Sequence, residues 1–287
     1  MKPIFGVDIT ENKKNERVCG AIFAARTVSP DAGKRLDTSV DKLEDVNQKA
    51  KLPLPVRILH YIFAFAAVIL TVGILRGTLK VGFAEGYANA PALFWLDGAA
   101  IVGVVICEIL ARVKKKEVRE ATGADEIEAT VIDEQENVLQ DLNVPPSAPC
   151  VDVLVFRFKN KNGEIKPYEG FSPSAYTALE MRMFKENGCL CLADLENVYA
   201  FPISELRGIR EVGKRISVMG WNKPEDPRSS QYKKYKLTVN NVGCVFSKPY
   251  YILELERDGE LYGIYFPCYE LGMFEKATGL SAEAKKD

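Results

Sequence analysis

The chain has 287 residues, and its 38 Lys and Arg nearly balance its 39 Asp and Glu, which leaves a formal net charge of −1. Apolar residues make up 47% and charged residues 27% of the chain, which excludes a protein that is disordered or collagen-like throughout. The balanced charge also argues against a basic surface over the whole molecule, so we expect no nucleic-acid partner.

The histidine and cysteine content limits the chemistry that the chain can support. His60 is the only histidine and lies in an apolar run, so Ser-His-Asp, Cys-His and multi-histidine metal sites lack their components. The seven cysteines include no CxxC motif, which argues against zinc fingers and a disulfide-rich scaffold. Cys189 and Cys191 fit one strand face, where we favour a buried apolar role over a metal or redox role. Because phosphate-binding loops and catalytic motifs are also missing, we predict a non-enzymatic protein without a cofactor or metal.

Residues 1–50 predict a small N-terminal cytosolic segment made of a β-hairpin and an amphipathic helix. Alternating apolar residues mark the first strand: Phe5, Val7 and Ile9. The run from Val18 to Ala25 forms the second strand. Ser29-Pro30-Asp31 is typical of a helix start. The apolar residues that follow have helical spacing: Leu36, Val40, Leu43 and Val46. This face must cover the rest of the chain or a second copy or, less readily, a membrane surface.

A first transmembrane helix is predicted over residues 56–76. The stretch from Ile58 to Leu75 contains 18 residues without a charge. As a helix it would be about 27 Å long, close to the thickness of a hydrocarbon core. A soluble helix of this length is rarely apolar on every face. We therefore expect it to cross a membrane.

A second transmembrane helix is predicted over residues 90–111. Asp97 and Glu108 lie within it, each close enough to an end to reach the membrane interface. The two acids are eleven residues apart and share one helix face. They indicate either an ion path through an oligomer or two ion pairs, of Asp97 with Arg76 and of Glu108 with Arg112.

Small residues recur at every fourth position of this second helix: Ala99, Gly103, Cys107 and Ala111. Such a stripe lets another helix approach closely. We expect it to be a helix-packing face, with the first transmembrane helix as its partner and a second copy as the alternative.

Lys and Arg are concentrated on one side of this hairpin. Four precede the first helix: Lys42, Lys49, Lys51 and Arg57. Five follow the second: Arg112, Lys114, Lys115, Lys116 and Arg119. The connection between the two apolar stretches, with its loop at residues 77–89, has only Arg76 and Lys80. Both termini should therefore be cytoplasmic, in a multi-pass protein of the inner or plasma membrane, with the loop outside. The cluster that follows the second helix should lie on the anionic membrane surface: Arg112, Lys114, Lys115 and Lys116.

Residues 112–149 form a linker that is first basic and then acidic. Between Glu117 and Asn143, nine Asp and Glu accompany a single basic residue. A rough helical period allows a continuation of the second helix, and the composition also allows a disordered tether. The clearest domain boundary follows at three prolines that break any helix: Pro145, Pro146 and Pro149.

Residues 150–280 are rich in strand signals and end in a helix, with residues 281–287 left as a tail. The strand candidates are the run VDVLVFRF, Tyr176–Phe184, Cys189–Leu195, Val198–Phe201, Ile209–Val218, Lys234–Val239, Tyr250–Glu256 and Leu261–Phe266. Hairpin turns are indicated at Asn162-Gly163, Asn187-Gly188 and Asp258-Gly259. The closing helix has an apolar stripe and a C-cap glycine: Leu271, Phe274, Ala277 and Gly279. This pattern predicts an antiparallel β-barrel or roll capped by a C-terminal helix.

Two stretches of this region resemble bacterial pleckstrin-homology-like (PH-like) and GRAM-type domains. The run CLADLENVYAFPISELRGIREV is similar to their strand–strand–turn–strand signature, with the turn from Pro202 to Leu206. The ending YFPCYELGMFEKATGL is similar to their closing strand and capping helix. The resemblance covers Tyr176 to Leu280. Together with the hairpin, it resembles uncharacterised bacterial two-span membrane proteins, and it implies a PH-like fold with a role in binding.

Lipid-binding PH domains carry clustered basic residues in their first hairpin, where this chain has only Arg182 and Lys185. A denser basic set lies further on: Arg207, Arg210, Lys214 and Arg215. This set is a candidate anion or lipid contact, and a solvated charged face is the simpler interpretation. The long polar loop from Gly220 to Gln231 indicates either a binding site or disorder.

The sequence thus predicts an α+β membrane protein, with a two-helix transmembrane hairpin and a cytosolic PH-like β domain. We expect a non-enzymatic protein that presents this module for protein or anionic-lipid binding or assembly. Its partners would be the lipid bilayer and either a second protein or a second copy. A small channel or transporter subunit formed by oligomerised hairpins is the alternative.

Overall fold

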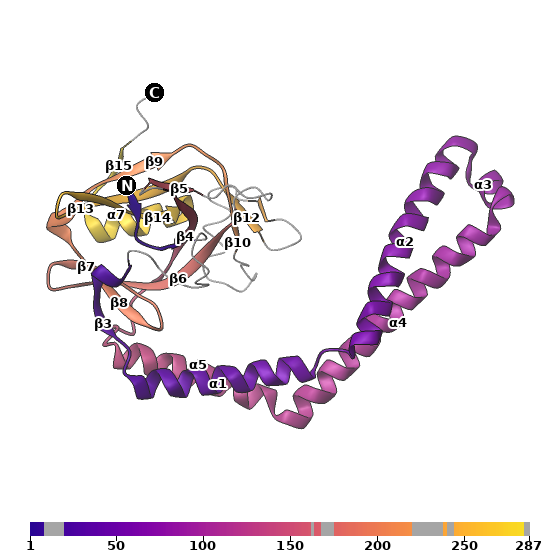
Figure 1. Ribbon diagram of the computed structural model, residues 1–287, viewed down its shortest axis with the longest axis horizontal. Coiled ribbons are helices and arrows are strands. Elements are labelled where there is room, and N and C mark those ends of the chain that lie inside the picture. The colour runs from indigo at the N-terminus through magenta and orange to yellow at the C-terminus, as the bar shows by residue number, and fades with distance from the viewer. Residues whose placement is uncertain (9–19, 162–163, 168–174, 220–237, 240–243, 284–287) are drawn as a thin grey trace. The chain divides into compact units, whose positions relative to one another are not determined.

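The computed structural model describes residues 1–8, 20–161, 164–167, 175–219, 238–239 and 244–283. The chain divides into two compact units (Figure 1). The first unit comprises residues 1–33 and 136–287, and the second comprises residues 34–135. The boundary falls inside two helices, α1 (Pro30–Lys49) and α5 (Ala124–Asp141). The N-terminal 33 residues therefore belong with the C-terminal strands instead of forming a separate segment with residues 34–50.

The fold is α+β, and its first unit contains two sheets. The five-stranded sheet has the order β1 (Lys2–Pro3), β14 (Glu260–Pro267), β13 (Tyr250–Arg257), β9 (Leu206–Val212) and β15 (Ala282–Glu283). Strand β13 pairs antiparallel with both of its neighbours, whereas the short edge strands β1 and β15 pair in parallel. The segment predicted as a tail after residue 280 thus contributes an edge strand.

The ten-stranded sheet contains the other strands. Its main path runs through β11 (Thr238–Val239), β12 (Cys244–Ser247), β10 (Ile216–Met219), β6 (Ala175–Glu186), β7 (Cys189–Ala193), β8 (Asn197–Pro202) and β3 (Ala24–Thr27). A branch leaves this path at β6, where β4 (Cys150–Lys161) pairs with β6, β5 (Glu164–Pro167) and β2 (Gly6–Asp8). The predicted strand from Ile209 to Val218 is divided between β9 and β10. Among the described strands no barrel is closed, so the two sheets are what the structure establishes.

Two of the three predicted hairpin turns are confirmed. Asn187 and Gly188 join β6 to β7 with φ angles of 49° and 75°, and Asp258 and Gly259 join β13 to β14 with 54° and 75°. Two consecutive residues with positive φ suit the twist of a tight hairpin, which is why Asn-Gly and Asp-Gly are favoured there. The third turn, Asn162-Gly163, and the loop from Gly220 to Gln231 lie outside the described residues.

The core lies between the two sheets and under the C-terminal helix α7 (Leu271–Thr278). Phe274 of α7 is fully buried and stacks on Phe266 of β14, with ring centroids 3.9 Å apart. Gly279 ends the helix in the left-handed conformation, and its N–H donates to Glu275 O. The predicted C-terminal helix and its C-cap are therefore confirmed, and in its apolar stripe Phe274 is buried while Leu271 and Ala277 are partly buried.

The N-terminal strands complete the two sheets, which corrects the predicted self-contained hairpin. Among the described residues, β1 pairs with β14, β2 with β4, and β3 with β8. Ile4, Phe5 and Phe23 are at most 2% exposed and belong to the main core. An isolated two-stranded hairpin is at best marginally stable in water, so its apolar residues are better buried in a larger core. The chain between the two predicted strands, residues 11–16, is outside the described part of the chain.

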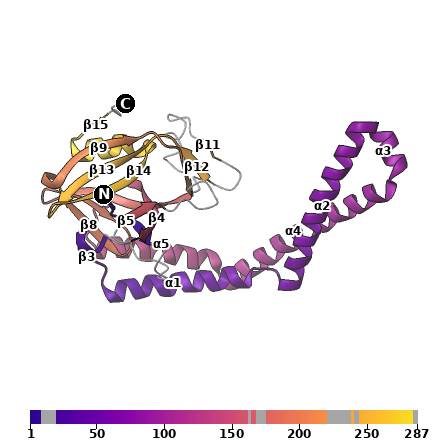
Figure 2. The same ribbon diagram turned by 45° about the horizontal axis from the view of Figure 1, so that its top comes forward.

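Helices α1 and α5 run antiparallel and side by side (Figure 1 and Figure 2). Ser29 is the N-cap of α1, since its Oγ accepts from the N–H of Ala32 at 3.4 Å, and its own N–H donates to Asp141 at 2.7 Å. The buried positions of α1 follow a repeat of four and three residues: Ala32, Leu36, Ser39 and Val46. Val40 is 41% exposed because this repeat passes through Ser39. The acidic part of the predicted linker is therefore helical from Ala124 to Asp141.

The second unit contains a hairpin of α2 (Leu54–Val81), α3 (Phe83–Asn89) and α4 (Pro91–Thr122). Helices α2 and α4 are long and apolar enough to cross a membrane. The predicted loop at residues 77–89 is largely helical, because α2 extends to Val81 and α3 follows. Helix α4 continues through the basic residues and ends at Gly123, which has a φ of 63°.

Helices α2 and α4 approach each other closely at Gly103. A Cβ atom on Gly103 would lie 2.6 Å from the Phe63 ring, so only glycine allows this approach. Ala100 and Cys107 are buried on the same face, whereas Ala99 is exposed and Ala111 is half-buried. A strict four-residue stripe drifts by about 40° per step around a helix, so it cannot follow one straight seam. Ala100 therefore takes the place predicted for Ala99.

Gly103→Ala should destabilise the hairpin, because its Cβ would overlap with the Phe63 ring. Overpacking of this kind costs about 1–3 kcal/mol. Gly98→Ala is the matched control in the same helix, since a Cβ there has no neighbour within 4 Å. Thermal unfolding of the full chain in detergent micelles, followed by circular dichroism, should show a lower midpoint for Gly103→Ala alone. Equal midpoints would contradict a close contact at Gly103.

Candidate functional site

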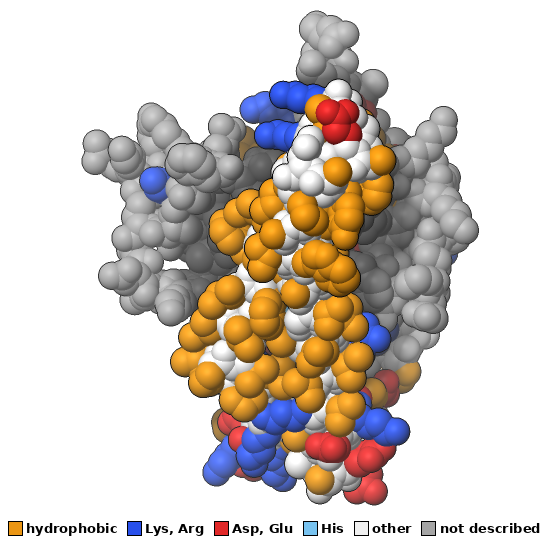
Figure 3. Space-filling model, turned by 90° about the vertical axis from the view of Figure 1, so that its right-hand side faces the viewer, with side chains coloured by type: hydrophobic (Ala, Val, Ile, Leu, Met, Phe, Trp, Pro, Cys, Tyr) orange, Lys and Arg blue, Asp and Glu red, His pale blue; other side chains and the backbone are white. Residues whose placement is uncertain are grey.

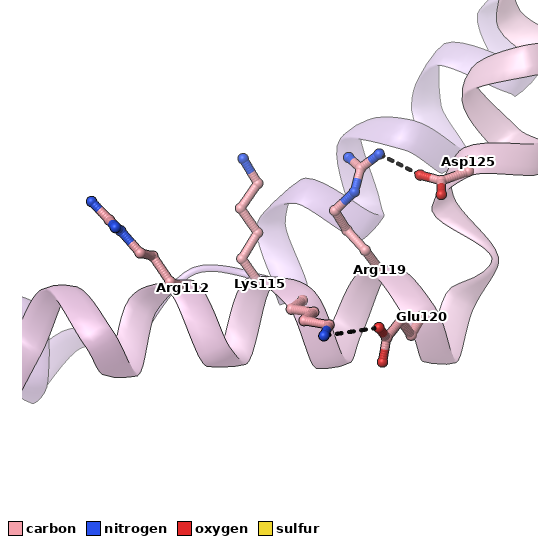
Figure 4. Close-up of a pocket in the computed structure, with 6 residues that line it drawn as sticks. Arg112, Lys115, Arg119, Glu120 and Asp125 are labelled. Atoms are coloured by element: carbon pink, nitrogen blue, oxygen red, sulfur yellow. Dashed lines mark hydrogen bonds and ion pairs between the residues drawn. The ribbon is translucent and has the colours of Figure 1, made fainter.

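Four basic side chains lie on one face of the last part of α4. Their spacing of three, four and seven residues places them on neighbouring turns: Arg112, Lys115, Lys116 and Arg119. With Glu120 and Asp125 they line a hollow of about 340 Å³ (Figure 4). The turn at Gly123 brings the start of α5 back towards Arg119. All six lining residues belong to the second unit.

Acidic residues neutralise one half of this hollow. The Arg119 guanidinium donates to Asp125 at 2.6 Å and to both carboxylate oxygens of Glu128 at 2.8 and 2.9 Å. The Lys116 ammonium lies 3.7 Å from the Glu120 carboxylate. The Arg119 contacts hold the end of α4 against the start of α5, whereas the Lys116–Glu120 pair lies within α4.

The other half of the hollow carries two cations without acidic partners. Arg112, Lys115 and Arg119 project from the same side of α4 (Figure 4). Among the residues that the structure describes, the Arg112 guanidinium and the Lys115 ammonium form no hydrogen bond or ion pair. Lys114 is different, because its ammonium donates to Lys51 O at 2.6 Å. In the predicted membrane-surface cluster, Lys114 and Lys116 therefore have partners. Among the described residues, Arg112 and Lys115 have none.

The two acids of the apolar hairpin face α2. Thr71 Oγ1 donates to both carboxylate oxygens of Asp97, at 2.9 and 3.1 Å. His60 Nε2 lies 3.6 Å from Glu108 Oε1. The structure therefore replaces the expected ion pairs with Arg76 and Arg112. Thr71 and His60 are eleven residues apart, as Asp97 and Glu108 are, and this shared spacing was the sequence signal for these contacts.

The basic set of the C-terminal region is largely engaged, which favours a solvated charged face over an anion or lipid site. Arg207 donates to Glu256 at 3.1 Å and Arg210 to Glu254 at 2.6 Å. These pairs connect the neighbouring antiparallel strands β9 and β13. The Arg215 guanidinium lies 4.3 Å from the Phe246 ring centroid, and the fourth member, Lys214, is exposed. Exposed pairs of this kind contribute about 0–1 kcal/mol each and leave little free charge for an anion.

The cysteines of β7 differ in their surroundings. Cys191 is 2% exposed and Cys189 is half-buried. Burial raises the pKa of the Cys191 thiol to about 11, and the nearby Glu186 carboxylate adds to this effect. Burial also raises the pKa of the Cys268 thiol. A protonated, buried thiol is a poor nucleophile and a poor metal ligand, which favours the apolar role for Cys191.

The comparisons with known proteins give no family assignment. No family model, no curated protein and no solved structure matches this chain. The resemblance to PH-like and GRAM-type domains therefore stays a prediction. A functional assignment has to rest on the geometry of the hollow and of the hairpin.

The Cys191 thiol should make the first unit sensitive to alkaline pH. Its pKa rises from an ordinary 9.0 to about 11 in the fold, so the folded state holds the proton more tightly. The resulting stability is complete below about pH 9 and is lost as the pH rises through 11, by on the order of 2 kcal/mol. The midpoint of thermal unfolding of the full chain, measured from pH 8 to 12, should therefore fall less steeply with pH for Cys191→Ala than for wild type.

Cys189→Ala is the matched control, because it removes a thiol from the same strand without removing the buried one. It should retain the steep alkaline decline of the wild type. If Cys191→Ala and Cys189→Ala gave the same pH profile, the Cys191 thiol would not be the group responsible.

Proposed function

We propose that this chain is an integral membrane protein that is anchored by the α2–α4 hairpin and presents its first unit in the cytoplasm for binding or assembly. One observation carries the anchor. Only 6% and 17% of the most apolar 18-residue stretches of α2 and α4 are buried. Apolar side chains cover the hairpin between charged groups at its two ends (Figure 3). A soluble protein rarely exposes an apolar surface of this extent, whereas a hydrocarbon core would cover it.

The distribution of charge supports the orientation. Arg57 and Arg112 lie just beyond the apolar parts of α2 and α4, at the end of the hairpin where the chain enters and leaves. At the other end, Trp95 is 71% exposed and would suit an interfacial aromatic belt. The excess of Lys and Arg at the first end favours a cytoplasmic location for both termini.

The first unit supports a binding role over a catalytic one. The only histidine of the chain lies in the hairpin beside Glu108, and the thiols of Cys191 and Cys268 are buried. A core of two sheets covered by one helix can hold surface loops and edge strands in place for a partner to bind. Its PH-like resemblance points to a protein or anionic-lipid partner.

In the alternative, a channel or transporter subunit, acidic side chains would have to face an ion path formed between the hairpins of several copies of the chain. Asp97 instead accepts the single hydroxyl hydrogen of Thr71, shared between its two carboxylate oxygens, within one hairpin. This contact supports a packing role for Asp97. The channel alternative stays a prediction, and we prefer the anchor.

Val68→Arg should prevent stable insertion of α2. Val68 lies near the middle of the apolar stretch and is 63% exposed, so an arginine there would meet hydrocarbon. A charge at the centre of a transmembrane helix costs roughly 2.5–3.5 kcal/mol. Ile132→Arg is the control, because Ile132 is 58% exposed on α5 outside the hairpin. Alkaline carbonate should extract Val68→Arg from membranes and leave wild type and Ile132→Arg in the pellet. Equal retention of all three would contradict the anchor.

The orientation predicts a defined labelling pattern. Ala84→Cys in α3 should react with a membrane-impermeant maleimide added to intact cells, because the turn of the hairpin would lie outside. Asp133→Cys in α5 should react only after the membrane is permeabilised. Wild type gives the background of the native cysteines. The reverse pattern would contradict the cytoplasmic location of the termini.

A further inference from the structure

We propose that the hollow at the α4–α5 turn binds the phosphomonoester headgroup of an anionic membrane lipid, held by Arg112 and Lys115. This inference rests on the proposed function, because only an inserted hairpin brings the hollow to the membrane surface. It goes beyond a general attraction to anionic lipid, since it assigns one ligand group to two named side chains.

The depth of the free cations matches a lipid headgroup. Arg112 is the first charged residue after the apolar part of α4, which ends at Ala111. At 1.5 Å per residue, Lys115 lies about 4.5 Å and Arg119 about 10 Å further along the helix axis. The two free cations are therefore at the hydrocarbon boundary, and the neutralised Arg119 is on the aqueous side.

The charge of the hollow matches a phosphomonoester. Four cations and two carboxylates line it, and a third carboxylate, that of Glu128, lies 2.8 Å from the Arg119 guanidinium. Arg119 and Lys116 thus have acidic partners, at 2.6 and 3.7 Å, and the two cations of the hollow without one among the described residues are Arg112 and Lys115. A phosphomonoester carries about −1.5 to −2 charges near neutral pH, whereas the phosphodiester of most lipids carries one. Two free cations therefore favour the monoester.

The geometry of the two side chains also suits a phosphate group. Arg112 and Lys115 stand one turn apart and rise from the same side of α4, with Arg112 leaning along the helix away from Lys115 (Figure 4). A guanidinium donates two parallel hydrogen bonds to phosphate oxygens, and an ammonium adds a compact charge beside it. The ion pairs of Arg119 position the α4–α5 turn in advance, so little ordering would accompany binding. Arg119 is in this sense a positioning residue.

A charge-matched comparison separates this site from diffuse attraction. The test variant, Arg112→Gln with Lys115→Gln, removes the two free cations. The control variant, Arg57→Gln with Lys114→Gln, removes two positive charges at the same end of the hairpin. In a diffuse attraction, each exposed basic residue near the membrane surface contributes about equally to the binding free energy. A discrete site depends only on Arg112 and Lys115, because the Lys114 ammonium is engaged with Lys51 O.

The experiment uses the full chain in nanodiscs of phosphatidylcholine with a minor fraction of phosphatidic acid. Native mass spectrometry then measures how much phosphatidic acid the protein retains when it is released from the disc. We expect the wild type and the control variant to retain one molecule. The test variant should lose retention by at least about tenfold, because two charge-assisted contacts are removed. An equal loss in both variants, or no retention by the wild type, would overturn the site.

Two further arms identify the ligand. Phosphatidylglycerol at the same fraction should be retained less than phosphatidic acid, and equal retention would overturn the assignment of a monoester. Millimolar inorganic phosphate should leave retention unchanged if the lipid is the ligand, whereas displacement would assign the site to free phosphate. Incorporation into discs of phosphatidylcholine alone is measured first for each variant. If the protein failed to enter these discs, the proposed membrane anchor would be contradicted. If it entered normally but retained phosphatidic acid and phosphatidylglycerol equally, only the proposed lipid site would be overturned.

Discussion

The close approach of Gly103 to the Phe63 ring sets the register on which the rest of the hairpin depends. In this register Asp97 lies opposite Thr71, and Glu108 lies opposite His60. The two acids within the apolar stretch of α4 are therefore paired with α2, and the outward faces of both helices carry apolar side chains there. This distribution is what a hydrocarbon environment requires, because unsatisfied polar groups are costly there. The same register brings Lys114 to Lys51 O and leaves Lys115 on a different side of α4.

The hairpin is inserted into a domain that both ends of the chain build together. Strands β1, β2 and β3 precede the hairpin, yet they pair with β14, β4 and β8, which come after it in the chain. Ile4, Phe5 and Phe23 supply part of the core of that domain. A fragment that starts at residue 150 would lack these side chains and expose the surfaces that they cover. The helical hairpin thus interrupts the sequence of the first unit, and neither follows the other as a separable domain.

Patterns within a few residues predicted much of the fold. The Asn187-Gly188 and Asp258-Gly259 turns, the Ser29 cap and the C-cap at Gly279 each depend on local backbone conformation, which short motifs specify. The apolar runs also predicted both long helices. Partners that lie far away in the sequence could not be predicted in this way. The pairing of Arg210 with Glu254 depends on the register of β9 against β13, and the burial of Ala100 in place of Ala99 depends on the line along which α2 crosses α4.

This difference explains why two basic clusters of similar density have different surroundings. On β9, the neighbouring strand places Glu254 and Glu256 beside the arginines, so the charge is neutralised within the sheet. On α4, Glu120 of the same helix pairs with Lys116, and the acids of α5 reach only Arg119 across the turn at Gly123. Arg112 lies two helical turns further from these acids, on the side of the apolar stretch. An acidic helix that follows a basic one neutralises only the cations within reach of the turn between them, so the charge that is left for an anion is the charge nearest to the apolar stretch of α4.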